Sequence, residues 1–199
     1  MVNTVEIVED VIPMEYLDMI KYTAMNSEAW HMKYPQNHPD KHLKMDIIDG
    51  DARQPLLAGM AMGLLIMIYK KCNLFRPEIT YAGISIKDKN RLDNPHTDHV
   101  NDLGHIKIFG LLNSDWGSMD GGLFLHGDEA IPMKPGNFVI FDPRITHSAS
   151  EITCDKQRLG LDFTVPINPQ GRFAYHSELD SCFTIWEDQQ RKSPPIAPV

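Results

Sequence analysis

Cysteine is scarce in this sequence, which has three among 199 residues. Cys72, Cys154 and Cys182 are odd in number and far apart, and the sequence has no Cys-x-x-Cys pair. We therefore expect neither a disulfide framework nor a zinc-finger site. The pattern instead indicates a protein of a reducing compartment. We interpret the three cysteines as ordinary thiols.

Long apolar runs are also lacking. The longest, Pro55 to Tyr69, is shorter than the roughly 20 residues that span a bilayer, and Arg53, Lys70 and Lys71 flank it closely. The sequence shows no basic region followed by an apolar run near its start, so we expect no signal peptide. We predict a soluble, cytoplasmic protein in which the apolar run forms a buried helix.

Positive charge is in short supply, since the formal net charge is −8 and the isoelectric point is about 5.5. Non-specific binding to nucleic acid or anionic membrane needs clustered Lys and Arg, so a nucleic-acid substrate is disfavoured. The 42% of hydrophobic residues can bury one substantial core. We expect one domain over residues 1–192 and a Pro-rich tail at 193–199.

Two helices are expected in the first part of the chain, about residues 13–75. Met14 to Met25 carries apolar residues at helical spacing after Pro13. Gln54 to Cys72 is apolar nearly all round, which is typical of a helix in the core or against a sheet. The polar stretch between them, Ala29 to Asp51, indicates a loop.

Short strands dominate the remainder, about residues 77–166, after an edge strand expected at Val5 to Val11. Each is bounded by Gly, Pro, Asn or Asp; they are Ile79 to Lys87, His105 to Leu112, Gly121 to His126, Asn137 to Asp142 and Arg158 to Val165. Because no helices separate them, we predict a mainly β fold, an antiparallel sandwich or barrel with the N-terminal helices packed outside.

A candidate metal site begins at His96 and Asp98. On extended backbone, residues two apart point to the same side, so both side chains can reach one metal. A third ligand is available in His147. Two His and one carboxylate leave positions open for a co-substrate and O2, which is the preference of Fe(II) oxygenases. An H-x-D pattern alone is a weak signal.

Arg158 follows His147 by eleven residues, at the start of the apolar stretch RLGLDFTV. An Arg in a strand that is otherwise core needs an anion to neutralise it. The far carboxylate of 2-oxoglutarate, gripped at two points, would be such an anion. A protein carboxylate, such as Asp162 or Glu151, would serve equally well.

The order of these motifs resembles the prolyl-hydroxylase branch of the 2-oxoglutarate/Fe(II) dioxygenases. After His96 and Asp98 come LNSDW (Leu112 to Trp116), Gly121-Gly122, PGNFVIFDP (Pro135 to Pro143), His147 and Arg158. Motif detail covers about seventy residues, Asn94 to Val165. The resemblance implies a double-stranded β-helix, the cupin-like jelly-roll fold. It also implies Fe(II) held by His96, Asp98 and His147, with Arg158 binding 2-oxoglutarate and O2 as oxidant.

The sequence departs from that family in one respect. Hypoxia-type prolyl hydroxylases use a Tyr on a core strand to help hold the co-substrate, but IKIFGLLNSDW contains none. Tyr81 is a candidate substitute, and a core aromatic is an equally good interpretation. Related halogenases replace the metal-binding carboxylate with a small residue, so Asp98 favours hydroxylation.

The other histidines are weaker candidates. His99 should face away from a site formed by His96. His105 and His126, on expected strands, could donate hydrogen bonds to the metal ligands, although packing is the simpler role.

The expected function is hydroxylation of a protein side chain, possibly prolyl, or of a small molecule, with formation of succinate and CO2. Substrate contacts are expected on Lys87 to Asn94 and Ala29 to Lys44. A non-catalytic cupin-like binding or sensing module is the alternative. A zinc hydrolase is less favoured, because no Glu or Asp is evidently placed as a general base.

Overall fold

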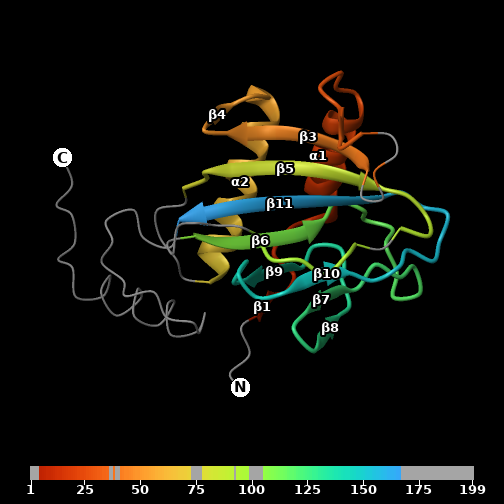
Figure 1. Cartoon of the computed structure of the whole chain (residues 1–199). Coiled ribbons are helices and arrows are strands. Elements are labelled where there is room, and N and C mark those ends of the chain that lie inside the picture. The colour runs from red at the N-terminus through yellow and green to blue at the C-terminus, as the bar shows by residue number, and fades with distance from the viewer. Residues whose placement is uncertain are drawn as a thin grey trace, which may run out of the picture.

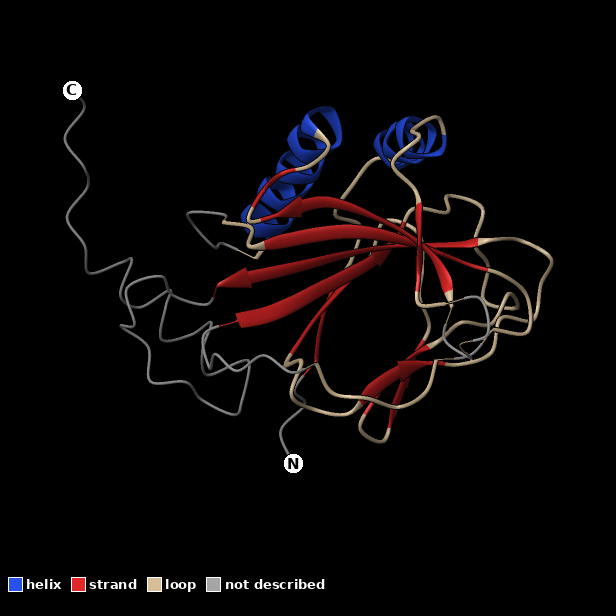
Figure 2. Cartoon of the chain, turned by 45° about the horizontal axis from the view of Figure 1, so that its top comes forward, coloured by secondary structure: helices blue, strands red, loops and turns tan. Residues whose placement is uncertain are grey.

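A computed structural model describes residues 5–35, 38, 41–72, 78–91, 93–98 and 105–166. In this part of the chain, antiparallel strands form two sheets, and two helices cover the outer face of the larger sheet (Figures 1 and 2). This arrangement confirms the predicted class, a mainly β jelly-roll with helices outside. The tail at 193–199 lies outside the described residues, so the extent of the domain stays a prediction.

The large sheet contains strands from both halves of the chain. In spatial order they are β1 (Val5–Val8), β9 (Phe138–Phe141), β6 (His105–Leu111), β11 (Arg158–Pro166), β5 (Tyr81–Lys87), β3 (His42–Asp49) and β2 (His31–Lys33), with β4 (Asp51–Ala52) beside β3. The small sheet consists of β10 (His147–Ala149), β7 (Phe124–His126) and β8 (Glu129–Ile131). Strands distant in sequence thus lie side by side, which brings residues near 90 and near 150 together.

The two helices, α1 (Met14–Met25) and α2 (Pro55–Lys71), pack on one face of the large sheet (Figure 2). Strand β11 explains why. Leu161 and Phe163 are fully buried in the core shared with the helices, whereas Arg158 and Asp162 line a cavity on the opposite face. Because apolar and charged residues alternate along β11, one face of the sheet packs against the helices and the other lines the cavity.

A second apolar cluster lies in the space between the two sheets. Its members include Leu111, Trp116, Phe124, Val139 and Phe141, all nearly inaccessible to solvent. Phe124 and Phe141 of this cluster also line the cavity described below.

The expectation of a loop over Ala29 to Asp51 was wrong, since β2, β3 and β4 all lie within that stretch. In β3, Met45 and Ile47 are fully buried, while His42 and Lys44 line the cavity. His42 and Lys44 therefore face the cavity, whereas Asp49 at the end of the strand is exposed. Counting them as loop signals concealed the alternation of a half-buried strand.

Other differences concern the ends of elements. The edge strand ends at Val8, and the strand expected from Gly121 begins at Phe124, after Gly121 forms an isolated bridge with Ile152. Within the described residues, no helix combines the length and the apolar character needed to cross a membrane.

Candidate metal and co-substrate site

His96 and His147 are joined through their backbones. The two residues form an isolated antiparallel bridge, with His96 N–H donating to the His147 carbonyl at 3.0 Å and His147 N–H donating to the His96 carbonyl at 2.8 Å. Two residues later, the Asp98 N–H donates to the Pro143 carbonyl at 2.9 Å. The loop after β5 is thereby held against β10 and the segment that precedes it, and the three predicted ligands meet.

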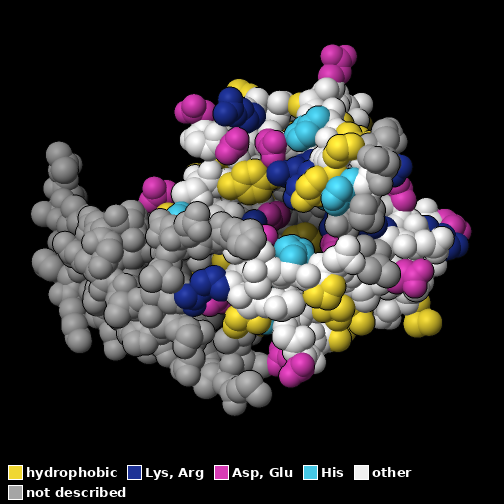
Figure 3. Space-filling model, in the orientation of Figure 1, with side chains coloured by type: hydrophobic (Ala, Val, Ile, Leu, Met, Phe, Trp, Pro, Cys, Tyr) yellow, Lys and Arg dark blue, Asp and Glu magenta, His cyan; other side chains and the backbone are white. Residues whose placement is uncertain are grey.

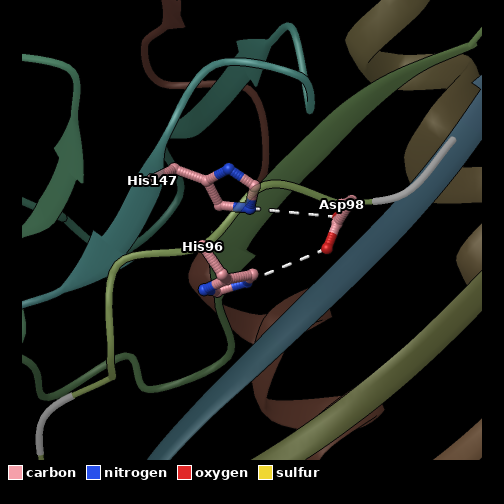
Figure 4. Close-up of side chains that lie close together, drawn as sticks. All are labelled: His96, Asp98 and His147. Carbon is pink, nitrogen blue, oxygen red and sulfur yellow. Dashed lines mark ion pairs between the residues drawn. The ribbon is translucent and has the colours of Figure 1, made fainter.

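The three side chains converge on one point (Figure 4). His96 Nε2 lies 3.8 Å from Asp98 Oδ1, and His147 Nε2 lies 3.9 Å from Asp98 Oδ2. The potential ligand atoms all lie within 4.8 Å of one another. Such a set, two imidazoles and one carboxylate, suits a divalent transition metal such as Fe(II).

Both imidazoles are oriented by the main chain. His96 Nδ1 lies 2.8 Å from the Asn94 carbonyl, and His147 Nδ1 lies 2.9 Å from the Ile145 carbonyl. Because a carbonyl can only accept, each Nδ1 carries the proton in the neutral ring, and each Nε2 keeps a lone pair. This is how second-layer hydrogen bonds prepare His ligands for a metal. Burial lowers the pKa of His147, which also favours its neutral form.

Asp98 has a cationic neighbour. Lys107 Nζ lies 3.5 Å from Asp98 Oδ2 and 2.6 Å from Asp162 Oδ2. Burial acts to lower the pKa of Lys107, but the carboxylates of Asp162 and Asp98 raise it above its ordinary value. The ammonium therefore stays charged and contacts Asp98 Oδ2, the oxygen that also faces His147.

The His96, Asp98 and His147 cluster lies in the wall of a cavity of about 580 Å³ between the two sheets. The rings of Phe109, Phe124 and Phe141 line it as well. A volume of this size is in the range of small-molecule sites, roughly 300–1,000 Å³. The cavity therefore has room for a small organic molecule beside the cluster.

Arg158 lines the same cavity and is only 2% exposed. Among the described residues, its Nε and Nη2 have no hydrogen-bond partner, and its guanidinium lies 5.0 Å from the centre of the Phe109 ring. The alternative partner Asp162 instead pairs with Lys107. Burial lowers the pKa of Arg158 to about 10, partly opposed by Asp93, so the group is charged at neutral pH. A buried charge with unused donors fits an anionic ligand.

Lys87 is the cross-strand neighbour of Arg158 and was not singled out from the sequence. The two residues are register partners in β5 and β11, and the Lys87 ammonium hydrogen-bonds to Asp93 Oδ2. Burial acts to raise the pKa of Asp93, but Lys87, Arg158 and Arg91 hold it below its usual value. Three cations thus surround one carboxylate, and a positive excess remains beside Arg158.

Gly122, from the Gly-Gly pair, makes room for Arg158. A Cβ at this position would lie 2.9 Å from Arg158 Nε and 3.0 Å from Cδ, and the backbone φ is +62°. Only glycine meets both demands without strain. The motif that carried part of the family resemblance thus has a direct structural reason.

Tyr81 also lines the cavity, but the structure does not bring it together with Arg158. Its hydroxyl donates to Asp46 Oδ1 at 2.9 Å, and it lies six residues along β5 from Lys87. Six residues of strand span about 20 Å. The role of Tyr81 in binding the co-substrate stays a prediction, and the geometry favours Lys87 for it.

The remaining candidate histidines do not join the cluster. His126 faces His147 across β7 and β10, and neither it nor His105 is among the cavity-lining residues. His99 lies outside the described residues. His42, which lies in the stretch expected to be a loop, does line the cavity. Its place on an alternating strand was the signal that could have found it.

No protein-family model matches the sequence, and the search of curated proteins found no match. Solved structures do match. A 2OG-Fe(II) oxygenase family oxidoreductase from Burkholderia pseudomallei superposes with a TM-score of 0.64 at 12% identity, covering 82% of this chain and 85% of that one.

Two further structures show the range of the likeness. A prolyl hydroxylase from Trichoplax adhaerens, solved with a hypoxia inducible factor peptide fragment, has a TM-score of 0.61 at 16% identity, over 82% of this chain and 84% of that one. HygX from Streptomyces hygroscopicus, solved with nickel, 2-oxoglutarate and hygromycin B, has a TM-score of 0.61 at 11% identity, over 89% and 93%. The chain therefore has the fold of the 2-oxoglutarate/Fe(II) oxygenases, prolyl hydroxylases included.

Proposed function

We propose that this protein is an Fe(II)- and 2-oxoglutarate-dependent dioxygenase that hydroxylates its substrate. One observation carries the proposal. A His-Asp-His cluster with both Nε2 atoms available faces the same cavity as a buried guanidinium whose Nε and Nη2 have no partner among the described residues. A metal set and a separate anion site in one cavity are what a metal-chelating dicarboxylate requires.

The roles of the residues follow from their surroundings. His96, Asp98 and His147 would hold the iron, which leaves the remaining coordination positions open toward the cavity. Arg158 would bind the far carboxylate of 2-oxoglutarate in a charge-assisted pair, with Lys87 adding positive charge from the neighbouring strand. Lys107 would help to orient Asp98 through its contact with Oδ2.

When bound, the iron and 2-oxoglutarate would supply the oxidation, in which one oxygen atom of O2 enters the substrate and the other enters succinate, with loss of CO2. The chain contributes position and exclusion of water. Phe109, Phe124 and Phe141 provide apolar walls beside the cluster, and such walls limit side reactions with solvent.

The structural relatives were solved with different classes of bound molecule. The Trichoplax enzyme was solved with a peptide fragment and HygX with hygromycin B. Both a protein side chain, possibly prolyl, and a small molecule therefore stay within the proposal. The cavity volume, about 580 Å³, favours the small molecule.

Succinate formation tests the proposal without knowledge of the substrate. The protein is incubated with Fe(II), ascorbate, O2 and 2-oxoglutarate, and succinate is measured by mass spectrometry. We expect slow turnover of 2-oxoglutarate without substrate, abolished in Asp98→Ala and unchanged in the matched exposed variant Asp155→Ala. Iron binding without any succinate, even with a broad panel of candidate substrates, would favour a cupin-like binding module.

A further inference from the structure

The cavity has a second charged region on the side of the large sheet formed by β5, β3 and β2. It is formed by Lys33 and Tyr34 at the end of β2, His42 and Lys44 on β3, and Tyr81 on β5, and we call it the hairpin wall. Figure 3 shows a hollow on this face, with Lys or Arg and His side chains around it. The proposed binding of iron and 2-oxoglutarate uses none of these residues except, as a prediction, Tyr81.

Charge distinguishes the cavity from the rest of the molecule. Among its lining residues, six are Lys or Arg and three are acidic, namely Asp93, Asp98 and Asp162. The whole chain, in contrast, has a net charge of −8. Binding of iron and 2-oxoglutarate would leave this excess in place, because a doubly positive ion and a doubly negative molecule cancel. The loaded cavity would therefore still attract an anion.

The carboxylates of the cavity have their own partners. Asp93 hydrogen-bonds to Lys87, Asp162 pairs with Lys107, and Asp98 belongs to the metal cluster. Lys33 is the cation left at the hairpin wall. Among the described residues it forms no ion pair, and its ammonium lies 5.1 Å from the centre of the Tyr34 ring.

Lys44 shares the carboxylate of Asp46 with the Tyr81 hydroxyl. Its ammonium lies 3.0 Å from Asp46 Oδ1 and 4.7 Å from the centre of the Tyr81 ring. Asp46 also accepts the Tyr81 hydroxyl and lies 3.5 Å from His31 Nε2, so its charge is shared among three neighbours. Lys44 therefore retains the capacity to bind another anion.

Two aromatic faces complete the wall. Tyr34 has a positive φ of 74°, which is unusual for a bulky residue and which surrounding contacts must stabilise. Its ring stacks on His38 at 4.4 Å between centroids. Tyr81 lies flat across Gly83, where a Cβ would meet its hydroxyl at 2.0 Å. Cations and aromatic faces thus alternate along the wall.

The wall lies next to the metal cluster. Lys107 connects them, since its ammonium is 3.5 Å from Asp98 Oδ2 and 5.5 Å from the centre of the Tyr81 ring. A molecule held by Lys33 and Lys44 would therefore extend toward the ligands from the β2–β3 side of the cavity, whereas Arg158 lies on β11. This is the geometry needed for a substrate that reacts beside a separately bound co-substrate.

We propose that the hairpin wall binds the carboxylate of a small acidic substrate, with Lys33 and Lys44 pairing with the charge and the two tyrosines packing against its body. The inference rests on the proposed function only in that it makes the bound acid a substrate. The charge pairing with the acid depends on Lys33 and Lys44, to which no part in holding iron or 2-oxoglutarate is assigned.

The test uses metal-free protein and a pair of probes of the same shape, phenylacetate and phenylacetamide, titrated by calorimetry at low ionic strength. We expect the acid to bind about tenfold more tightly than the amide and to weaken with added salt. Lys33→Gln should weaken the acid roughly fivefold or more, since it removes one charge pair. Lys33 lies near the surface at a strand end, so this variant should fold. Lys70→Gln, exposed on α2, is the matched control.

Arg158→Gln separates the two anion sites. Phenylacetate should still bind this variant, and Lys33→Gln should still weaken it there. Equal binding of acid and amide, or no binding of the acid, would overturn the proposal. So would loss of binding in Arg158→Gln alone, which would place the anion in the co-substrate pocket. If a capped acidic peptide bound more tightly than phenylacetate, and if its binding depended on Lys33, the ligand of the hairpin wall would be a peptide and not a small molecule. Since no iron is present, none of these outcomes depends on the proposed oxygenase activity.

Discussion

His96 and His147 hydrogen-bond to each other through both of their backbone groups, although 50 residues separate them in the chain. The Nδ1 atom of each ring faces the carbonyl two residues earlier. The protein thus fixes the position and the tautomer of both imidazoles before any metal arrives, which lowers the cost of assembling the site.

Metal should therefore stabilise the folded protein. Anaerobic Fe(II) at about one hundred times its dissociation constant should add about 2.7 kcal/mol to the free energy of unfolding. For a chain of this size that raises the melting temperature by roughly 5–10 °C. His147→Ala should lose the shift, and His31→Ala, whose side chain is 49% exposed and outside the cluster, should keep it. A shift that persists in His147→Ala would mean that the metal binds elsewhere.

Replacing Arg158 by Met should separate stability from binding. Burial lowers the pKa of Arg158, which means that the folded state disfavours its charge. Removal of an unpaired buried charge should raise the free energy of unfolding by about 1–3 kcal/mol in denaturant titration. Affinity for 2-oxoglutarate should fall about thirtyfold or more, because a desolvated charge pair is lost, while iron affinity should hold. A destabilised variant with normal co-substrate binding would contradict both parts.

Lys87 should support the same carboxylate. Lys87→Gln keeps a donor for Asp93 but removes one positive charge opposite Arg158, so 2-oxoglutarate affinity should fall about tenfold. Lys89→Gln is the control, because Lys89 is exposed and pairs with Asp155. Isothermal titration with the iron-loaded protein under anaerobic conditions measures both. Equal affinities of the two variants for 2-oxoglutarate would mean that the positive charge of Lys87 supports the folded structure but not co-substrate binding.

Gly122→Ala should disturb the co-substrate site through Arg158. The added methyl would meet Arg158 Nε at 2.9 Å on a backbone of positive φ. Gly127→Ala carries the backbone strain alone, since φ there is +56° and nothing lies within 4 Å of the added atom. Both variants should lose about 1 kcal/mol of stability from the backbone, but only Gly122→Ala should lose 2-oxoglutarate affinity. Equal affinities would show that Arg158 moves aside freely.

The sequence predicted most of what depends on local pattern. The helix from Met14 and the strand from Arg158 follow from periodicity. The motif order predicted that His96, Asp98 and His147 would lie together, since H-x-D on extended backbone points two side chains one way, while their role as iron ligands stays a proposal. The sequence did not predict contacts between residues on paired strands. Lys87 gains its place opposite Arg158 only through the pairing of β5 with β11, which no local pattern encodes.

The error at β3 has the same origin. Its charged residue Lys44 lines the cavity and pairs with Asp46, so these polar side chains serve a site rather than solvent. A sequence pattern cannot distinguish a functional interior from an exterior. Consequently, the part of the chain interpreted as a loop supplies every residue of the hairpin wall except Tyr81.

The most direct test of the central claim is an anaerobic titration of metal-free protein, first with Fe(II) and then with 2-oxoglutarate, followed by visible absorption. Chelation of the keto acid to iron should give a weak charge-transfer band that saturates near one equivalent and that is absent in His96→Ala and His147→Ala. Tight iron binding without such a band, or a band that both variants retain, would contradict the assignment of this cluster as the iron and 2-oxoglutarate site.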